Sequence, residues 1–188
     1  MKWFWIGLGI VGLLSVSALW LVRADYQRGD ELTPLTVASV WGLYLAHFAL
    51  ELYAALMQFY PIGFAPALLI GLGVILTLAG TVLYALGILH LRSIRRMSGV
   101  DTSQLITDGV YSWTRNPQNV GWILFLFGVA FIARSWFALL LAALFAGVFA
   151  LYVPMEERHL AGIYDESYRR YKAQSHRYLG WPRSDRRA

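Results

Sequence analysis

Long apolar runs separated by short polar stretches dominate the hydrophobic pattern of the chain. A helix needs about 20 apolar residues to cross roughly 30 Å of hydrocarbon. Five runs reach or approach that length, over residues 3–22, 36–60, 66–90, 120–133 and 135–153. Only Arg134 separates the short fourth run from the fifth, which predicts a tight antiparallel helical hairpin. We therefore expect an all-α polytopic membrane protein with about five transmembrane helices and a polar helical tail.

The composition agrees with this pattern. Of the 188 residues, 58% are hydrophobic and 14% are charged, and the mean hydropathy is +0.52. A soluble domain is closer to one-half apolar and one-quarter charged, so an ordinary soluble enzyme and a disordered chain are not expected. The absence of cysteine excludes a disulfide scaffold and a Cys-ligated metal site. The first run is too long for a typical signal-peptide core, and we interpret it as a retained span.

The distribution of basic residues predicts how the chain is oriented across the membrane. Two of the 16 Lys and Arg residues lie in the first loop, four in the third and eight in the tail, whereas Lys2 and Arg134 lie on the other side. Positive charge concentrates on the cytoplasmic side of membrane proteins. The tail is therefore expected in the cytoplasm and the N-terminus outside. The pI of about 9.6 then reflects topology and anionic lipid rather than nucleic-acid binding.

Small residues recur in the predicted spans. Gly7-Leu-Gly-Ile-Val-Gly12 matches the dinucleotide pattern G-x-G-x-x-G, but that motif requires a preceding strand and here lies inside a spanning helix. We interpret these glycines as small residues that permit close helix contact. The same interpretation applies to Gly71, Gly73 and Gly80, and to Ala138, Ala142 and Ala146.

Polar groups share one face of the second span. Tyr44, His47 and Glu51 lie at i, i+3 and i+7, and Glu51 is the only acidic residue within the predicted spans. Ionisable groups in a membrane usually face a cavity or a partner. Two interpretations stay open: a polar patch near the substrate, or a structural His47–Glu51 hydrogen bond. Zinc is not expected, because two ligands on one helix do not complete a tetrahedral site.

The third loop carries the most informative stretch. Asp108-Gly109 predicts a turn, and Asn116 before Pro117 predicts that the fourth span begins there. A helix start offers free N–H groups to an anion, and Arg115 adds a cation beside it. The stretch is either a cradle for an anion or cofactor, or an interfacial loop with snorkelling Arg and Trp side chains.

The tail begins with a second informative stretch. Glu156 and Glu157 follow the fifth span, which ends at Pro154, and two acids at the start of a helix favour its dipole. Leu160, Tyr164, Tyr168 and Tyr171 then form a helical stripe. We expect this stripe to pack on the third loop or to lie in the membrane interface.

Together the two stretches resemble the isoprenylcysteine carboxyl methyltransferases and their phospholipid methyltransferase relatives. The shared positions are Gly109, Tyr111, Arg115, Pro117, Gly121, Glu156, Glu157, Leu160, Tyr168 and Tyr171. The resemblance covers about residues 91–182. The chain departs from the family pattern at four places. Asn116 replaces the family's His, and Asn119 replaces a Tyr. Tyr164-Asp165 replaces Phe-Gly, and Tyr152 replaces the Arg of the carboxyl methyltransferases.

The resemblance implies an integral membrane methyltransferase that binds S-adenosylmethionine without a Rossmann domain. It implies a cofactor pocket lined by Leu105, Ile106, Tyr111, Asn116, Pro117, Asn119, Glu156, Tyr168 and Tyr171. Arg115 would orient an anionic group or hold the loop. Glu51, His47 or Glu157 could serve as a general base for an amine or hydroxyl acceptor.

The expected acceptor is a lipophilic or small amphiphilic molecule from the bilayer. We do not expect a prenylcysteine carboxylate, because the Tyr152 hydroxyl cannot neutralise that charge. Two alternatives stay open, an NADPH-dependent sterol-type reductase and a non-catalytic membrane protein. We expect no bound metal ion, and the sequence does not determine the oligomeric state.

The expected organisation is a single membrane domain over residues 1–188. Its parts are three N-terminal spans (1–90), a cytoplasmic loop with the cofactor motif (91–119), a helical hairpin (120–153) and a tail that closes the cofactor site (154–188).

Overall fold

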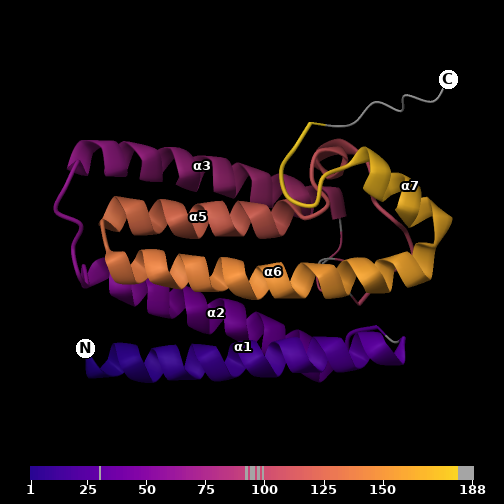
Figure 1. The fold of residues 1–188 in the computed structure, drawn as a ribbon, viewed down its shortest axis with the longest axis horizontal. Helices are drawn as coiled ribbons and strands as arrows, with labels where there is room; N and C mark the ends of the chain where they lie inside the picture. The colour runs from indigo at the N-terminus through magenta and orange to yellow at the C-terminus, as the bar shows by residue number, and fades with distance from the viewer. Residues whose placement is uncertain (30, 92, 94–95, 97, 99, 182–188) are drawn as a thin grey trace.

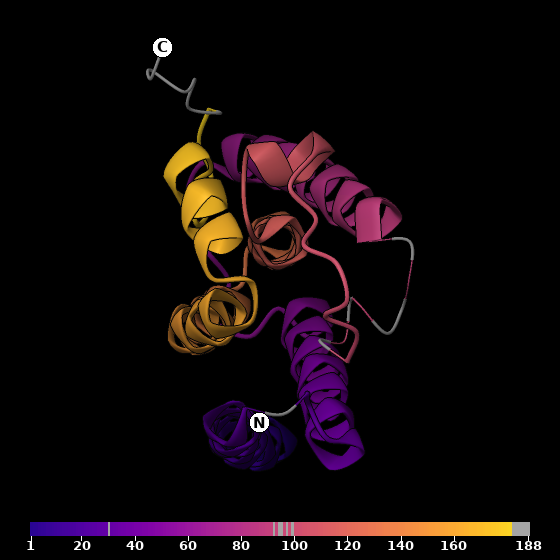
Figure 2. The same ribbon diagram turned by 90° about the vertical axis from the view of Figure 1, so that its right-hand side faces the viewer.

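The structure, a computed structural model, describes residues 1–29, 31–91, 93, 96, 98 and 100–181. Five of the basic residues used above to orient the chain, Arg92, Arg95, Arg183, Arg186 and Arg187, lie outside the described residues. The helices pack lengthwise, and α5 lies between α3 and α6 (Figures 1 and 2). The elements are α1 (Lys2–Arg28), α2 (Pro34–Leu56), α3 (Pro66–Leu91), the short 3₁₀ helix η1 (Gly109–Ser112), α5 (Pro117–Ala133), α6 (Trp136–Tyr164) and α7 (Glu166–Gln174).

Apolar helices make up the bundle. Four of them, α1, α2, α3 and α6, are long and apolar enough to cross a membrane, and α5 is a shorter apolar helix of 17 residues. Large apolar side chains such as Trp20, Ile75 and Leu78 point outward and are exposed. An outer surface of this kind suits contact with lipid chains. The prediction of an all-α polytopic membrane protein is confirmed, with α5 as the short helix among about five.

Two helices run further than predicted. α1 continues past Val22 to Arg28, and α6 continues through Pro154 to Tyr164. A proline removes one backbone hydrogen bond and crowds the preceding turn, yet α6 continues across Pro154. Glu156 and Glu157 therefore lie inside a helix, and the prediction that they begin one is wrong. Glu51 is also not the only acid in a spanning helix, because α1 contains Asp25.

A buried carboxylate joins the first two helices. Asp25 is 3% exposed. Its Oδ2 accepts from the Thr33 backbone N–H at 2.9 Å, the Thr33 hydroxyl at 3.0 Å and the Thr36 hydroxyl at 2.6 Å. Thr33 caps α2, and Pro34 follows in the first turn. The short connection thus fixes α2 antiparallel to α1.

Glycines bring α3 and α5 into close contact. A Cβ on Gly80 would lie 2.5 Å from the Phe125 backbone nitrogen, and one on Gly121 would lie 2.5 Å from the Tyr84 nitrogen. Gly73 meets Ile132 in the same way, whereas Gly71, Gly9 and Gly12 have no neighbour within 4 Å among the described residues. Close glycine packing therefore exists at Gly73 and Gly80, but not at Gly71 or along most of the α1 motif.

The hairpin between α5 and α6 is as tight as predicted. Arg134 ends α5 in the left-handed region, with φ 51°, and the Ser135 side chain caps α6. The same turn holds the α2–α3 connection, since Ile62 N–H donates to the Arg134 carbonyl at 2.6 Å and Ser135 Oγ donates to the Phe59 carbonyl at 2.8 Å. This end of the bundle is closed by hydrogen bonds, and the opposite end carries α7 (Figure 1).

Candidate active site

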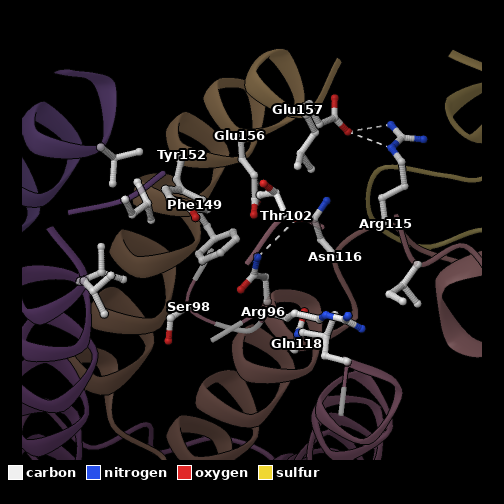
Figure 3. A pocket seen from close by; sticks show the side chains of 18 of the residues that line it. Arg96, Ser98, Thr102, Arg115, Asn116, Gln118, Phe149, Tyr152, Glu156 and Glu157 are labelled. Carbon is white, nitrogen blue, oxygen red and sulfur yellow. Dashed lines mark hydrogen bonds and ion pairs between the residues drawn. The ribbon is translucent and has the colours of Figure 1, made fainter. Parts of the chain in front are cut away.

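A cavity lies at the end of the bundle where α6 passes into α7. Figure 3 shows side chains from several elements pointing into it. α1 and α2 contribute an apolar side, which we call the acceptor wall: Ala18, Leu19, Val22, Val37, Val40, Trp41, Leu43 and Tyr44. The loop after α3, the first turn of α5 and α6 contribute a polar side, which we call the polar wall: Arg96, Asp101, Arg115, Asn116, Gln118, Asn119, Glu156 and Glu157.

A glycine turn sets the course of the loop. Gly109 has φ +57°, and a Cβ there would collide with the His90 ring, so only glycine fits. The following η1 buries Tyr111, whose hydroxyl donates to the Gly87 carbonyl at 3.4 Å. The Tyr171 hydroxyl donates to the Tyr111 carbonyl at 2.9 Å. The loop is therefore held between α3 and α7, with Tyr111 facing the cavity.

α5 begins at Pro117, as the Asn-Pro pair predicts. The helix start places three amide side chains in the cavity, those of Asn116, Gln118 and Asn119, of which Figure 3 labels the first two. Asn119 Nδ2 donates to Asn116 Oδ1 at 3.3 Å. The Tyr44 hydroxyl donates to Asn119 Oδ1 at 3.2 Å, and Asn116 Nδ2 donates to the Arg177 carbonyl at 3.0 Å. A chain of hydrogen bonds therefore runs from α2 through the helix start to the tail.

The adjacent glutamates of α6 point in different directions, because successive helical residues differ by about 100°. The Glu156 carboxylate points into the cavity beside Tyr152 (Figure 3). None of the described residues gives it a hydrogen bond or an ion pair. Glu157 is 5% exposed and points toward Arg115. One glutamate thus offers a free carboxylate to a ligand, and the other holds protein groups.

Two arginines share the Glu157 carboxylate. Arg115 donates to Oε1 from Nε at 2.9 Å and from Nη2 at 2.8 Å. Arg177 donates to Oε2 from Nε at 3.0 Å and from Nη2 at 2.7 Å. The Glu157 carboxylate raises the pKa of Arg177 further above its usual range. The other arginine of the polar wall, Arg96, pairs with Asp101 at 3.1 Å, so each cavity arginine described already has an anionic partner.

Tyrosines from α7 close the cavity. Tyr168 is 2% exposed and Tyr171 is 6% exposed, and both pack with Tyr111, Leu105 and Ile106. Burial raises the pKa of Tyr168 and of Tyr171 above the usual tyrosine range, so the two hydroxyls stay neutral at physiological pH. Of the two predicted positions for the tyrosine stripe, packing on the third loop is the one observed. The stripe is divided at Asp165, where φ is 42° and α6 gives way to α7.

Most of the predicted site residues meet in this one cavity. Its lining includes Leu105, Ile106, Tyr111, Arg115, Asn116, Asn119, Glu156, Glu157, Tyr168 and Tyr171. Pro117 lies behind the wall, packed against Gly87 of α3. The sequence therefore identified a group of residues that the fold brings together, and their individual roles stay predictions.

His47 and Glu51 lie outside this lining. Both are buried, and the His47 ring packs against Phe145, a residue of the cavity lining, at a centroid distance of 4.8 Å. His47 Nε2 hydrogen-bonds with the Leu141 carbonyl at 2.9 Å, whereas His47 Nδ1 and Glu51 Oε2 are 3.8 Å apart. Neither Glu51 oxygen has a hydrogen-bond partner among the described residues. The expected His47–Glu51 hydrogen bond is therefore not formed.

Sequence reasoning missed other cavity residues. Phe149, Tyr152 and Glu156 lie at i, i+3 and i+7 of α6, so helical spacing would have found the first two from the third. Gln118, beside the predicted Pro117 and Asn119, also lines the cavity. Arg177 carried no local signal, because its contact with Glu157 spans 20 residues of chain and depends on the course of the tail.

Comparisons with known proteins place the chain. No curated protein and no solved structure matches it significantly. One family profile, described as phospholipid methyltransferase, matches residues 67–167. The match includes α3, the third loop, α5 and α6, and it leaves out α1 and α2. It covers more than half of the chain and contains both stretches that build the polar wall, so the protein belongs to the phospholipid methyltransferase family of membrane methyltransferases.

Proposed function

We propose that the protein transfers a methyl group from S-adenosylmethionine to a lipophilic acceptor held in the membrane. One observation carries this proposal: a single cavity joins a free carboxylate, Glu156, to an apolar wall formed by α1 and α2. The carboxylate end suits a small charged cofactor, and the apolar end suits an acceptor from the bilayer. We assign residues 91–119 and 154–188 to the cofactor and the first two helices to the acceptor.

The polar wall fits the cofactor in charge and shape. S-adenosylmethionine carries an ammonium, a sulfonium and a carboxylate, and the half-buried Glu156 carboxylate, which has no partner among the described residues, favours the cationic groups. Glu156 would hold the ammonium, while Asn116 and Asn119 offer amide groups to its polar atoms. Tyr111, Tyr168 and Tyr171 would enclose the adenosine, with Leu105 and Ile106 as apolar contacts. When bound, the cofactor supplies an electrophilic methyl group on sulfur.

The contribution of the protein would be alignment and exclusion of water. The cofactor would supply the methyl group to a nucleophilic atom of the acceptor as the carbon–sulfur bond breaks, with S-adenosylhomocysteine as the leaving group, and the proton of an amine, hydroxyl or thiol acceptor would be released to water. Phe149 and Tyr152 would hold the acceptor next to Glu156 on the same face of α6. Glu157 is occupied by Arg115 and Arg177, and neither His47 nor Glu51 lines the cavity. We therefore propose that none of Glu157, His47 and Glu51 acts as a general base.

The ion pairs favour an acceptor without a carboxylate. Arg96 pairs with Asp101 and Arg115 pairs with Glu157, so the described part of the cavity has no unpaired arginine for an acceptor carboxylate in addition to the carboxylate of the cofactor. Tyr152, which stands where the carboxyl methyltransferases have Arg, adds only a hydroxyl. The acceptor that we propose is a lipid or small amphiphile that reacts through an amine, a hydroxyl or a thiol.

We also propose that the cavity end of the bundle faces the cytoplasm, where the cofactor is made available. The distribution of Lys and Arg supports this orientation. The chain has no cysteine, so a Leu179→Cys variant can be labelled specifically in intact cells. Labelling by a membrane-impermeant maleimide only after the cells are opened is the expected result. Labelling in intact cells would show that the cavity end faces outward and would contradict the proposed orientation.

The central test is binding followed by turnover. Calorimetry on the purified protein should detect S-adenosylmethionine and S-adenosylhomocysteine but not NADPH. A radiolabelled methyl-transfer assay should then show turnover with an aminophospholipid or a small lipophilic thiol, and little with a farnesylcysteine analogue. Binding of NADPH alone would support the reductase alternative, and binding of neither ligand would support a non-catalytic protein. Efficient methylation of the farnesylcysteine analogue would contradict the proposed acceptor class.

A further inference from the structure

The segment after α7 crosses the loop that forms the polar wall. Thr114 and His176 form a parallel bridge, and the Arg115 backbone N–H donates to the His176 carbonyl at 2.8 Å. Asn116 Nδ2 donates to the next carbonyl, that of Arg177, at 3.0 Å. Three successive loop residues are thus paired with two tail residues. These tail residues directly follow α7, which carries the two tyrosines that close the cavity. The pairing of the tail with the loop therefore helps to hold those tyrosines in place.

A buried charge cluster fastens the same crossing. We call Arg115, Glu157 and Arg177 the tail latch. Arg115 bonds both Glu157 and the Ser175 carbonyl, the latter at 2.6 Å, and Arg177 bonds the other oxygen of Glu157. The latch joins the third loop, α6 and the tail at one carboxylate.

The three members differ in exposure. The side chains of Arg115 and Glu157 are 7% and 5% exposed, whereas that of Arg177 is 39% exposed. Water can replace the partner of a partly exposed charge at low cost, but breaking a buried pair leaves an unpaired charge and costs far more. The Arg177 side of the latch is therefore the side that opens first, and Arg115 keeps Glu157 paired while it does so.

We propose that Arg177 is a positioning residue that controls exchange of the cofactor, by closing α7 and the tail over the polar wall. This inference rests on the proposed function. A charged cofactor cannot pass through the lipid-facing sides of the bundle, so it reaches Glu156 from the end that the tail covers. Each exchange then requires the Arg177–Glu157 contact and the tail–loop hydrogen bonds to open.

The first test compares arginines on the same tail. Arg177→Gln should speed dissociation of S-adenosylhomocysteine about tenfold, as expected for loss of a charged hydrogen bond, and Arg177→Lys should restore part of the slow rate. Arg169→Gln is the control, because among the described residues Arg169 forms ion pairs only with exposed Asp165 and Glu166. This control should change neither the dissociation rate nor the single-turnover methylation rate at saturating cofactor. A purely structural role would instead lower the thermal midpoint of Arg177→Gln and leave the dissociation rate unchanged, which would overturn the proposal.

The second test locks the tail. Partners in neighbouring strands lie about 4.8 Å apart, within the range that a disulfide can bridge, so Thr114→Cys with His176→Cys can be cross-linked in a chain free of other cysteines. Protein that is loaded and then oxidised should retain its ligand, and protein oxidised while empty should bind slowly. Reductant should reverse both effects, and each single variant serves as a control.

The two tests separate failure of the latch from failure of the proposed function. If the wild-type protein binds neither S-adenosylmethionine nor S-adenosylhomocysteine, the proposed function is wrong. If it binds them and fully oxidised protein exchanges ligand at the unlocked rate, the proposed function stands and the role of the tail latch is wrong.

Discussion

The two walls of the cavity come from parts of the chain with different character. The acceptor wall is formed by α1 and α2, which lie outside the phospholipid methyltransferase match, and it is apolar except for Tyr44. The polar wall is formed mainly by residues inside the match, and it contains every charged residue of the described cavity lining. The matched portion therefore supplies the charged side of the cavity, and the N-terminal helices supply its apolar side.

Packing follows the same division. In the matched portion, α3 and α5 approach so closely that a Cβ on Gly80 or Gly121 would overlap backbone atoms. In α1, a Cβ on Gly9 or Gly12 would meet no described atom within 4 Å, and the nearest atoms to a Cβ on Gly7 would belong to the flexible Leu50 side chain. The matched helices form a close-fitting support for the polar wall, while α1 is joined more loosely and presents wide apolar faces.

The largest effect is expected at the free carboxylate. Glu156→Gln should weaken binding of S-adenosylmethionine by roughly 1–3 kcal/mol, because a charged hydrogen bond is lost in a buried site. Glu51→Gln is the matched control, since Glu51 is buried but does not line the cavity. Calorimetry on both variants measures the difference. Equal affinities for the two would show that the cofactor is not held by the polar wall.

The packing difference predicts a contrast between glycines. Gly80→Ala should lower the free energy of unfolding by about 1–3 kcal/mol, because the added methyl group forces α3 away from α5. Gly9→Ala in α1 should be neutral or stabilise by up to about 1 kcal/mol, since alanine is the better helix former and the site is open. Unfolding in mixed detergent followed by circular dichroism measures both. A larger loss for Gly9→Ala would contradict the division into close and loose packing.

The acceptor wall can be narrowed without touching the polar wall. Val40→Phe places a larger side chain in the cavity and should raise the KM for a long-chain acceptor several-fold, with the cofactor Kd unchanged, because added volume excludes part of the chain. Val16→Phe on the outer face of α1, where Val16 is 69% exposed, is the control. If Val40→Phe changed the cofactor Kd and left the acceptor KM unchanged, the α1–α2 side of the cavity would bind the cofactor instead, which would contradict the proposed roles of the two walls.

The smallest effect is expected at the rim of the polar wall. Hydrogen bonds from Ser103 lower the pKa of Asp101 to about 2. A lowered pKa means that the charged form stabilises the fold above the unfolded pKa of about 4, and that this contribution is lost as the pH falls toward 2. Asp101→Asn should change cofactor affinity less than about threefold, since the pair with Arg96 is partly accessible to water, with side chains 23% and 28% exposed. A step in affinity between pH 5 and 8 that disappears in Asp101→Asn would contradict this.

Part of the site could be read from the chain. The Asp108-Gly109 turn and the Asn116-Pro117 helix start depend on local backbone chemistry, and both occur where predicted. The prediction that the helix ends at Pro154 was wrong, because α6 continues on both sides of the proline. Because the helix was expected to end at Pro154, Glu156 and Glu157 were wrongly predicted to begin the next helix. The side that each glutamate faces depends on a helix whose length local rules did not predict.

The sequence by itself determined the apolar helices, the tight α5–α6 turn and the loop motif, because run length, proline and glycine act within a few residues of the chain. Only the tertiary structure decided which charges are free. Glu156 and Glu157 are chemically identical neighbours, yet Arg115 lies 42 residues and Arg177 20 residues from the one they both bind. Helical geometry turns Glu156 away from those arginines and into the cavity. The difference between a ligand-binding carboxylate and a structural one therefore arises from packing between distant segments, which no local pattern encodes.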